Sequence, residues 1–134
     1  MSKILIVDDD PDLIEACRPF LEKEGHEVAS ASNAEEGRRA IDREKPDLVI
    51  LDVMMEQGDD GIVMAQELRR TGFTTPILML TGISRVMVRE FDRDKEMIPV
   101  DAFLEKPIAP KTLIAKVREL LAKQEGKPNA RHRT

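Results

Sequence analysis

The sequence has no tryptophan, no tyrosine and a single cysteine. Aromatic residues make up only 3% of the 134 positions, so the core must be built from aliphatic side chains in a chain that is 41% hydrophobic. The single cysteine, Cys17, excludes an internal disulfide, which is typical of proteins in a reducing compartment. We therefore expect a cytoplasmic protein. The length of the chain favours one domain over two.

The sequence also lacks a long hydrophobic run. No apolar segment reaches the ~18 residues that cross a bilayer, and the start of the chain is too short for a signal peptide before the first apolar run at residues 4–7. The formal net charge is −5 although residues 123–134 are basic, so the rest of the chain is strongly acidic. We expect neither nucleic acid nor a membrane as a direct partner. We also expect one domain over residues 1–122 and a disordered basic tail over 123–134.

Short apolar runs alternate with segments of helical spacing along the chain. Continuous runs bounded by polar or turn residues predict three buried strands, and weaker patterns predict two shorter ones. The expected strands lie at residues 4–7, 27–31, 47–52, 76–80 and 102–104. The expected helices lie at residues 11–24, 34–45, 61–71 and 110–121, with a looser one between Gly82 and Pro99. This alternation predicts a doubly wound α/β fold with a five-stranded parallel sheet.

Polar side chains stand where four of these strands end. Asp8 and Asp9 follow the first strand, Asp52 ends the third, Thr81 ends the fourth, and Lys106 follows the fifth. Because the carboxyl ends of parallel strands share one edge of the sheet, these residues can converge there. Three close carboxylates repel one another and favour a hard divalent cation such as Mg²⁺. A carboxylate beside Mg²⁺ can attack phosphorus, while a lysine and a hydroxyl bind the oxygens of the transferred group.

Four motifs in this order resemble those of the receiver domains of two-component response regulators. They are Ile-Leu-Ile-Val-Asp-Asp-Asp-Pro at 4–11, Leu-Asp-Val-Met-Met at 51–55, Leu-Thr-Gly at 80–82 and Phe-Leu-Glu-Lys-Pro at 103–107. The resemblance covers nearly all of residues 3–122. It implies the flavodoxin-like (βα)5 fold of that family, with strand order 2-1-3-4-5.

The resemblance also implies a role for each matching residue of the metal site. Asp52 would be the phosphoryl acceptor. Asp9, Asp52 and the backbone carbonyl of Met54 would bind Mg²⁺, and Asp8 would act on the metal through water.

Three further residues match the part of the family pattern that binds and reports the phosphoryl group. Lys106 would pair with that group, and Thr81 would hydrogen-bond to it and move. Phe103 would be the aromatic switch residue that turns when Thr81 moves.

The implied protein is a signalling module and not an enzyme with a separate substrate. We expect a stand-alone receiver that takes its phosphoryl group from a sensor histidine kinase or a histidine phosphotransfer protein. Phosphorylation would switch a protein-binding face built from the fourth helix, the last strand and the last helix. The domain would be a monomer or a phosphorylation-dependent dimer.

Two other interpretations are disfavoured. Phosphohydrolases or phosphotransferases of the haloacid-dehalogenase type also use an aspartate at a strand end, Mg²⁺, a hydroxyl and a lysine. That class needs a second acid two residues after the nucleophile, and here that position is Met54. A degenerate receiver that binds partners without phosphate is disfavoured because all five polar residues at the strand ends are present.

Overall fold

The structure is a computed structural model of the chain that describes residues 2–53, 60–82 and 100–125. Five strands and four helices lie in these ranges. They are β1 (Lys3–Val7), α1 (Pro11–Lys23), β2 (Glu27–Ala31), α2 (Ala34–Glu44), β3 (Leu48–Asp52), α3 (Asp60–Arg70), β4 (Ile77–Thr81), β5 (Ala102–Glu105) and α5 (Pro110–Glu125). The helix expected between Gly82 and Pro99 lies outside the described residues.

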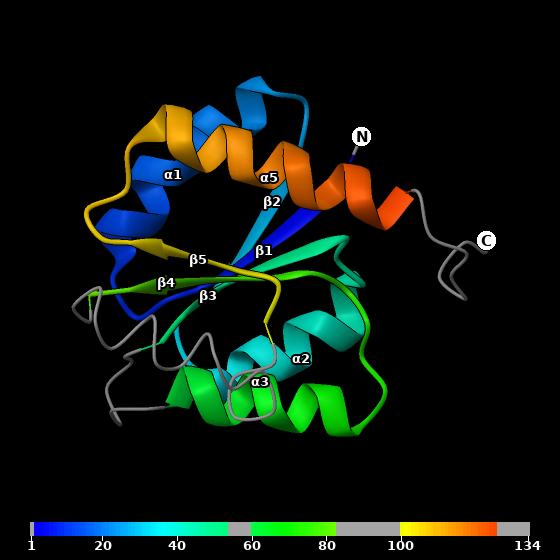
Figure 1. Cartoon of the computed structure of the whole chain (residues 1–134). Helices are drawn as coiled ribbons and strands as arrows, with labels where there is room; N and C mark the ends of the chain where they lie inside the picture. Colours follow the sequence, from blue (N-terminus) through cyan, green and yellow to red (C-terminus); the bar gives the residue numbers. More distant parts are fainter. Residues whose placement is uncertain (1, 54–59, 83–99, 126–134) are drawn as a thin grey trace.

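The five strands form one parallel sheet in the order β2-β1-β3-β4-β5, which confirms the predicted order. The arrows of β4 and β5 point to the left in Figure 1, so the carboxyl edge of the sheet lies on that side. Helices α1 and α5 cover one face of the sheet, and α2 and α3 cover the other. Strand β5 is at the end of the sheet and pairs only with β4 among the described strands.

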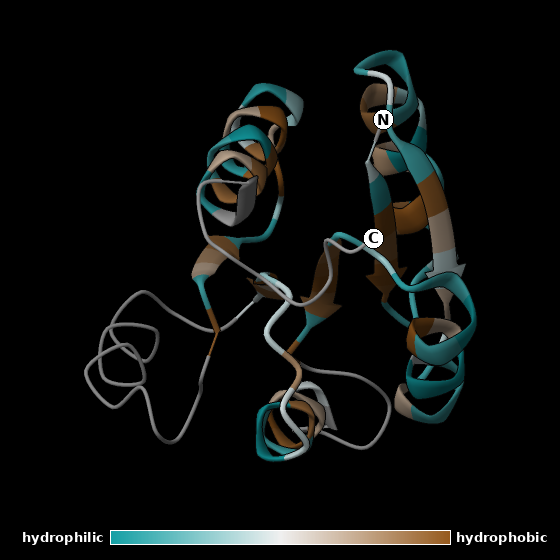
Figure 2. Ribbon diagram, turned by 90° about the vertical axis from the view of Figure 1, so that its right-hand side faces the viewer, coloured by the Kyte–Doolittle hydropathy of each residue, from teal (hydrophilic) through white to brown (hydrophobic). Residues whose placement is uncertain are grey.

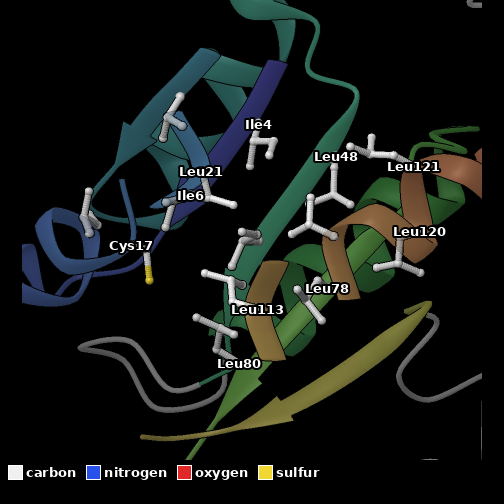
Figure 3. Packing of buried hydrophobic residues seen from close by; sticks show 14 residues of the cluster. Ile4, Ile6, Cys17, Leu21, Leu48, Leu78, Leu80, Leu113, Leu120 and Leu121 are labelled. Atoms are coloured by element: carbon white, nitrogen blue, oxygen red, sulfur yellow. The ribbon is translucent and has the colours of Figure 1, made fainter. Parts of the chain in front are cut away.

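The side chains of the central strands alternate between the two faces, as the two-residue period of a strand requires. On the α1/α5 face, strand residues pack against both helices, and Figure 3 shows Cys17 and Leu21 of α1 and Leu113, Leu120 and Leu121 of α5 in this cluster. The strand residues of this face are Ile4, Ile6, Leu48, Ile50, Leu78 and Leu80. Those of the α2/α3 face are Leu5, Val7, Val49, Leu51, Ile77 and Met79.

This two-sided burial explains why the central strands are continuous apolar runs. In Figure 2 the inner strands are brown, whereas the helices alternate between brown and teal because each helix buries only one side. Cys17 lies in the core, as its helical position predicted. No helix in the described ranges is long and apolar enough to span a bilayer.

Helix α5 continues to Glu125, so it enters the segment expected to be a tail from residue 123 onward. The remaining residues of that segment, 126–134, lie outside the described part. The boundary of the domain at residue 122 and the disorder of the tail stay predictions.

Candidate functional site

Two buried carboxylates stand at the carboxyl edge of adjacent strands. Asp8 follows β1 and is 0% exposed, and Asp52 is the last residue of β3 and is 2% exposed. Asp8 Oδ1 accepts a hydrogen bond from Asp10 N at 2.9 Å. Asp10 in turn caps α1 by accepting from Asp12 N at 2.9 Å, with Pro11 in the first turn. The turn after β1 is therefore built by its own acidic residues.

The carboxylates of Asp8, Asp9 and Asp52 form a cluster that could hold a metal ion. Their nearest oxygens all lie within 4.8 Å of one another. At that separation two buried charges repel by about 3 kcal/mol at an effective dielectric of 20. Asp8 Oδ2 is buried, and the charged group that lies near it within the described residues is the ammonium of Lys106. Oxygen-only donors of this kind fit Mg²⁺.

Lys106 brings a cation to this cluster. Its Nζ lies 3.3 Å from Asp8 Oδ2 and 3.3 Å from Asp52 Oδ1. Burial alone would lower the pKa of Lys106, but Asp52 and Asp8 outweigh burial and raise its pKa above the ordinary value. Lys106 therefore stays protonated at neutral pH. The backbone positions it as well, because Lys106 N donates a hydrogen bond to Thr81 O at 2.8 Å.

The remaining expected residues in the described part of the chain lie on β4 and β5, next to this cluster in the order of the sheet. In β5, Ala102 and Leu104 pack on the α1/α5 face and Phe103 packs on the α2/α3 face. The same alternation relates Thr81, which is buried at the end of β4, to Ile77 and Met79 of the α2/α3 face. Thr81 pairs with Glu105 and Met79 pairs with Phe103, so Thr81 and Phe103 are diagonal neighbours across the two strands. Met54 lies outside the described residues.

One close approach at the site was not predicted from the sequence. A Cβ built on Gly61, near the start of α3, would lie 2.0 Å from the backbone oxygen of Asp52 and 2.8 Å from Val53 Cα. Only glycine allows α3 to begin this close to the acceptor's main chain. The available signal was an Asp-Gly pair at the expected start of the helix.

Cys17 of α1 lies close enough to the site for the charges of Asp8 and Lys106 to act on its thiol. Burial raises the pKa of its thiol, the charge of Asp8 raises it further, and Lys106 lowers it. A thiol with a raised pKa carries little thiolate at neutral pH, which agrees with an inert residue.

Comparison with known proteins gives one family. The family model for the response regulator receiver domain matches residues 4–118. The alkaline phosphatase synthesis transcriptional regulatory protein PhoP of Bacillus subtilis (strain 168) is 36% identical over 125 residues, which cover 92% of this chain and 50% of PhoP. The chain therefore spans about half the length of this curated relative, and the expected stand-alone state stays a prediction.

Solved structures agree with this result. The CheY-like response regulator receiver domain protein from Methanospirillum hungatei JF-1 has a TM-score of 0.83 and 29% identity, covering 96% of this chain and 99% of that one. The BeF3-activated N-terminal receiver domain of Klebsiella pneumoniae RstA has a TM-score of 0.77 and 32% identity, covering 89% of this chain and 97% of that one.

Proposed function

Because the chain belongs to the response regulator receiver domain family, we propose that it accepts a phosphoryl group on Asp52 and thereby switches a protein-binding surface. The observation that carries this proposal is the placement of Lys106 Nζ 3.3 Å from both Asp8 and Asp52 at the carboxyl edge of the sheet. Three carboxylates and one lysine at this edge provide a nucleophile, a set of metal ligands and a cation for the incoming oxygens.

The proposed reaction is a transfer of the phosphoryl group to a carboxylate oxygen of Asp52. This oxygen forms the new bond to phosphorus while the bond from phosphorus to a histidine nitrogen, or to the acyl oxygen of a small acyl phosphate, breaks. The leaving group keeps the electron pair of the broken bond. Asp9, Asp52 and the backbone carbonyl of Met54 would hold Mg²⁺, with Asp8 acting through water, and the ion would neutralise charge on the phosphoryl oxygens. Lys106 exchanges part of its contact with Asp52 for a phosphoryl oxygen.

The proposed switch uses Thr81 at the end of β4 and Phe103 of β5. Thr81 donates a hydrogen bond to the phosphoryl group, and Phe103 turns inward into the space that Thr81 leaves. Two charge-assisted hydrogen bonds, from Thr81 and Lys106, supply roughly 3–6 kcal/mol. Moving a two-state equilibrium from 1:99 to 99:1 takes about 5.5 kcal/mol, so the shift is large.

The proposed partners follow from this chemistry. A histidine kinase or a histidine phosphotransfer protein supplies the phosphoryl group, and a protein target binds the face that includes β5 and α5. The chemistry is limited to phosphorylation and hydrolysis at Asp52. The stand-alone state, a cytoplasmic location and a monomer or phosphorylation-dependent dimer remain part of the proposal.

The test is intact-mass spectrometry after incubation with acetyl phosphate and Mg²⁺. The wild-type chain should gain one phosphoryl group, and Asp52→Asn should gain none. Asp47→Asn is a matched control because Asp47 directly precedes β3, at the end of the strand opposite to Asp52. Equal phosphorylation of wild type and Asp52→Asn would reject Asp52 as the acceptor.

A further inference from the structure

A second cluster of charge lies at the amino edge of the sheet, far from the acceptor. Arg69, in the last turn of α3, donates from Nη1 to Phe73 O at 2.9 Å and to Thr75 O at 2.8 Å, and from Nη2 to Asp101 Oδ2 at 2.8 Å. Its side chain is only 22% exposed, and that of Asp101 is 39% exposed. One guanidinium thus joins α3, the approach to β4 and the residue that precedes β5.

Asp101 also makes a two-bond connection to the first residue of β4. Its backbone N donates to Ile77 O at 3.0 Å, and its Oδ2 accepts from Ile77 N at 2.8 Å. These bonds set where β5 begins on β4. The register that follows pairs Leu78 with Ala102 and ends with Thr81 paired to Glu105.

Strand β5 therefore has an ion pair at each end. Asp101 pairs with Arg69 before the strand, and Lys106 pairs with Asp8 and Asp52 after it. At a rise of about 3.3 Å per residue the two ends are about 16 Å apart. A displacement at the Asp101 end is therefore passed along a short, extended segment to Lys106.

The weak burial of β5 makes this anchor important. All five residues of β3 are buried, whereas the four residues of β5 are partly or largely exposed. Within the described sheet β5 has one neighbouring strand, whereas β3 has two. The register of β5 therefore depends on fewer backbone hydrogen bonds and less apolar packing than the register of β3.

We propose that Arg69 and Asp101 are positioning residues for Lys106: they fix the register of β5 on β4 and so hold the lysine against Asp8 and Asp52. The phosphorylation readout of this proposal rests on the proposed function, whereas the register itself does not. The pair acts through the strand, because its hydrogen bonds join α3, the segment before β4 and the residue before β5.

The first measurement is residue-resolved amide hydrogen exchange, which needs no phosphorylation. Arg69→Gln and Asp101→Asn should speed exchange of the Lys106 amide, which donates to Thr81 O, and leave the β1 amides unchanged relative to wild type. Asp101→Asn keeps an oxygen that can accept a hydrogen bond from Ile77 N, so this variant should fold even if Arg69→Gln does not. The exchange measurement can then be made on Asp101→Asn alone. Arg38→Gln is the matched control, because it removes the Arg38–Glu67 ion pair between α2 and α3 without touching β5.

The second measurement is the rate of phosphorylation by acetyl phosphate at saturating Mg²⁺. Both variants should react about tenfold more slowly, because a small misplacement of a positioned group has effects of this order. Their Mg²⁺ affinity and the rate of Arg38→Gln should match wild type. In a Lys106→Met background, Arg69→Gln should cause no further loss of rate.

Two results would overturn the proposal. One is unchanged exchange of the Lys106 amide in both variants. The other is an equal loss of rate from Arg69→Gln with and without Lys106, which would show a general structural effect. If the wild-type chain takes up no phosphoryl group, the proposed function fails, and the exchange data still decide whether this pair sets the register.

Discussion

The two edges of the sheet use aspartate in opposite ways. At the amino edge, Asp47 accepts from Lys3 N at 2.8 Å and its own N donates to Lys3 O at 2.7 Å, and Asp101 forms the same pair of bonds with Ile77. At the carboxyl edge, Asp8 and Asp52 are buried beside each other and share one lysine. The difference teaches that a carboxylate beside a strand stabilises the fold when it accepts from backbone N–H groups and adds charge repulsion when it lies beside another carboxylate.

The largest effect is expected from Gly61 in the first turn of α3, with Gly72 beyond the other end of the helix as its comparison. Gly61→Ala places a Cβ against the backbone of Asp52 and should lower the free energy of unfolding by about 3 kcal/mol. Gly72, past the other end of α3, has a φ of +92° but open space around it, so Gly72→Ala should lose about 1 kcal/mol. Urea denaturation measures both. Equal losses would show that contact with Asp52 adds nothing to the cost.

A smaller change in the free energy of unfolding should distinguish Asp47 at the amino edge from Asp52 at the carboxyl edge. Asp47→Ala leaves Lys3 N without its carboxylate acceptor and should cost about 2 kcal/mol. Asp52→Ala relieves repulsion with Asp8 and should cost less than Asp47→Ala in metal-free buffer. Chemical denaturation in the presence of a chelator gives both values. A larger loss for Asp52→Ala would contradict the functional assignment of the carboxyl edge.

In the presence of Mg²⁺, the carboxylates of the carboxyl edge should stabilise the fold, because the metal ion offsets their repulsion. At ten times its dissociation constant, Mg²⁺ should stabilise the wild-type chain by about 1.4 kcal/mol. Asp9→Ala should lose this gain, because it removes one carboxylate of the cluster. Asp12→Asn is a suitable control, since Asp12 is an exposed acid in the first turn of α1 and outside the cluster. Thermal unfolding with and without Mg²⁺ measures the difference, and equal gains in all three proteins would reject the site.

The smallest effect concerns His26, which precedes β2 at the amino edge. Its Nδ1 is buried and has no hydrogen-bond partner within the described residues. Burial lowers its pKa, Glu24 opposes that change, and the N-terminal amine and Arg118 add to it. The unfolded chain therefore binds a proton at His26 at a higher pH than the folded chain does. Stability should fall as the pH drops from 7.5 through the ordinary histidine pKa near 6.5.

The control for this pH effect is His26→Gln, which cannot titrate in this range. Its stability should change less than that of wild type between pH 7.5 and 5.5. An identical slope in the two proteins would show that other groups cause the pH dependence.

The fold was predictable because its signals are local. Aliphatic runs such as residues 48–51, the cap at Asp10 with Pro11, and the turn residues each report on a few neighbouring positions. The convergence of Asp8, Asp52 and Lys106 was also predictable, since parallel strands end at one edge. The sequence alone could assign them roles only through the family resemblance.

The contacts that could not be predicted from the sequence join residues that are far apart along the chain. Arg69 and Asp101 are separated by 32 positions, and neither stands out in a helix or a turn rich in charge. Asp47 is visible as the residue before a strand, but its bonds to Lys3 span 44 positions. The close approach of Gly61 to Asp52 depends on the angle at which α3 meets the sheet. Such facts require the three-dimensional arrangement.

The side chains of β5 alternate between the two faces of the sheet, so the length of this strand determines which face each of them meets. Ala102 and Leu104 face α1 and α5, and Phe103 faces α2 and α3. Removing one residue between Asp101 and Lys106 would exchange these faces, carrying the lysine away from Asp8 and Asp52 and the aromatic ring away from the α2/α3 cluster. A change in the length of β5 therefore removes the charge contact and the aromatic contact together.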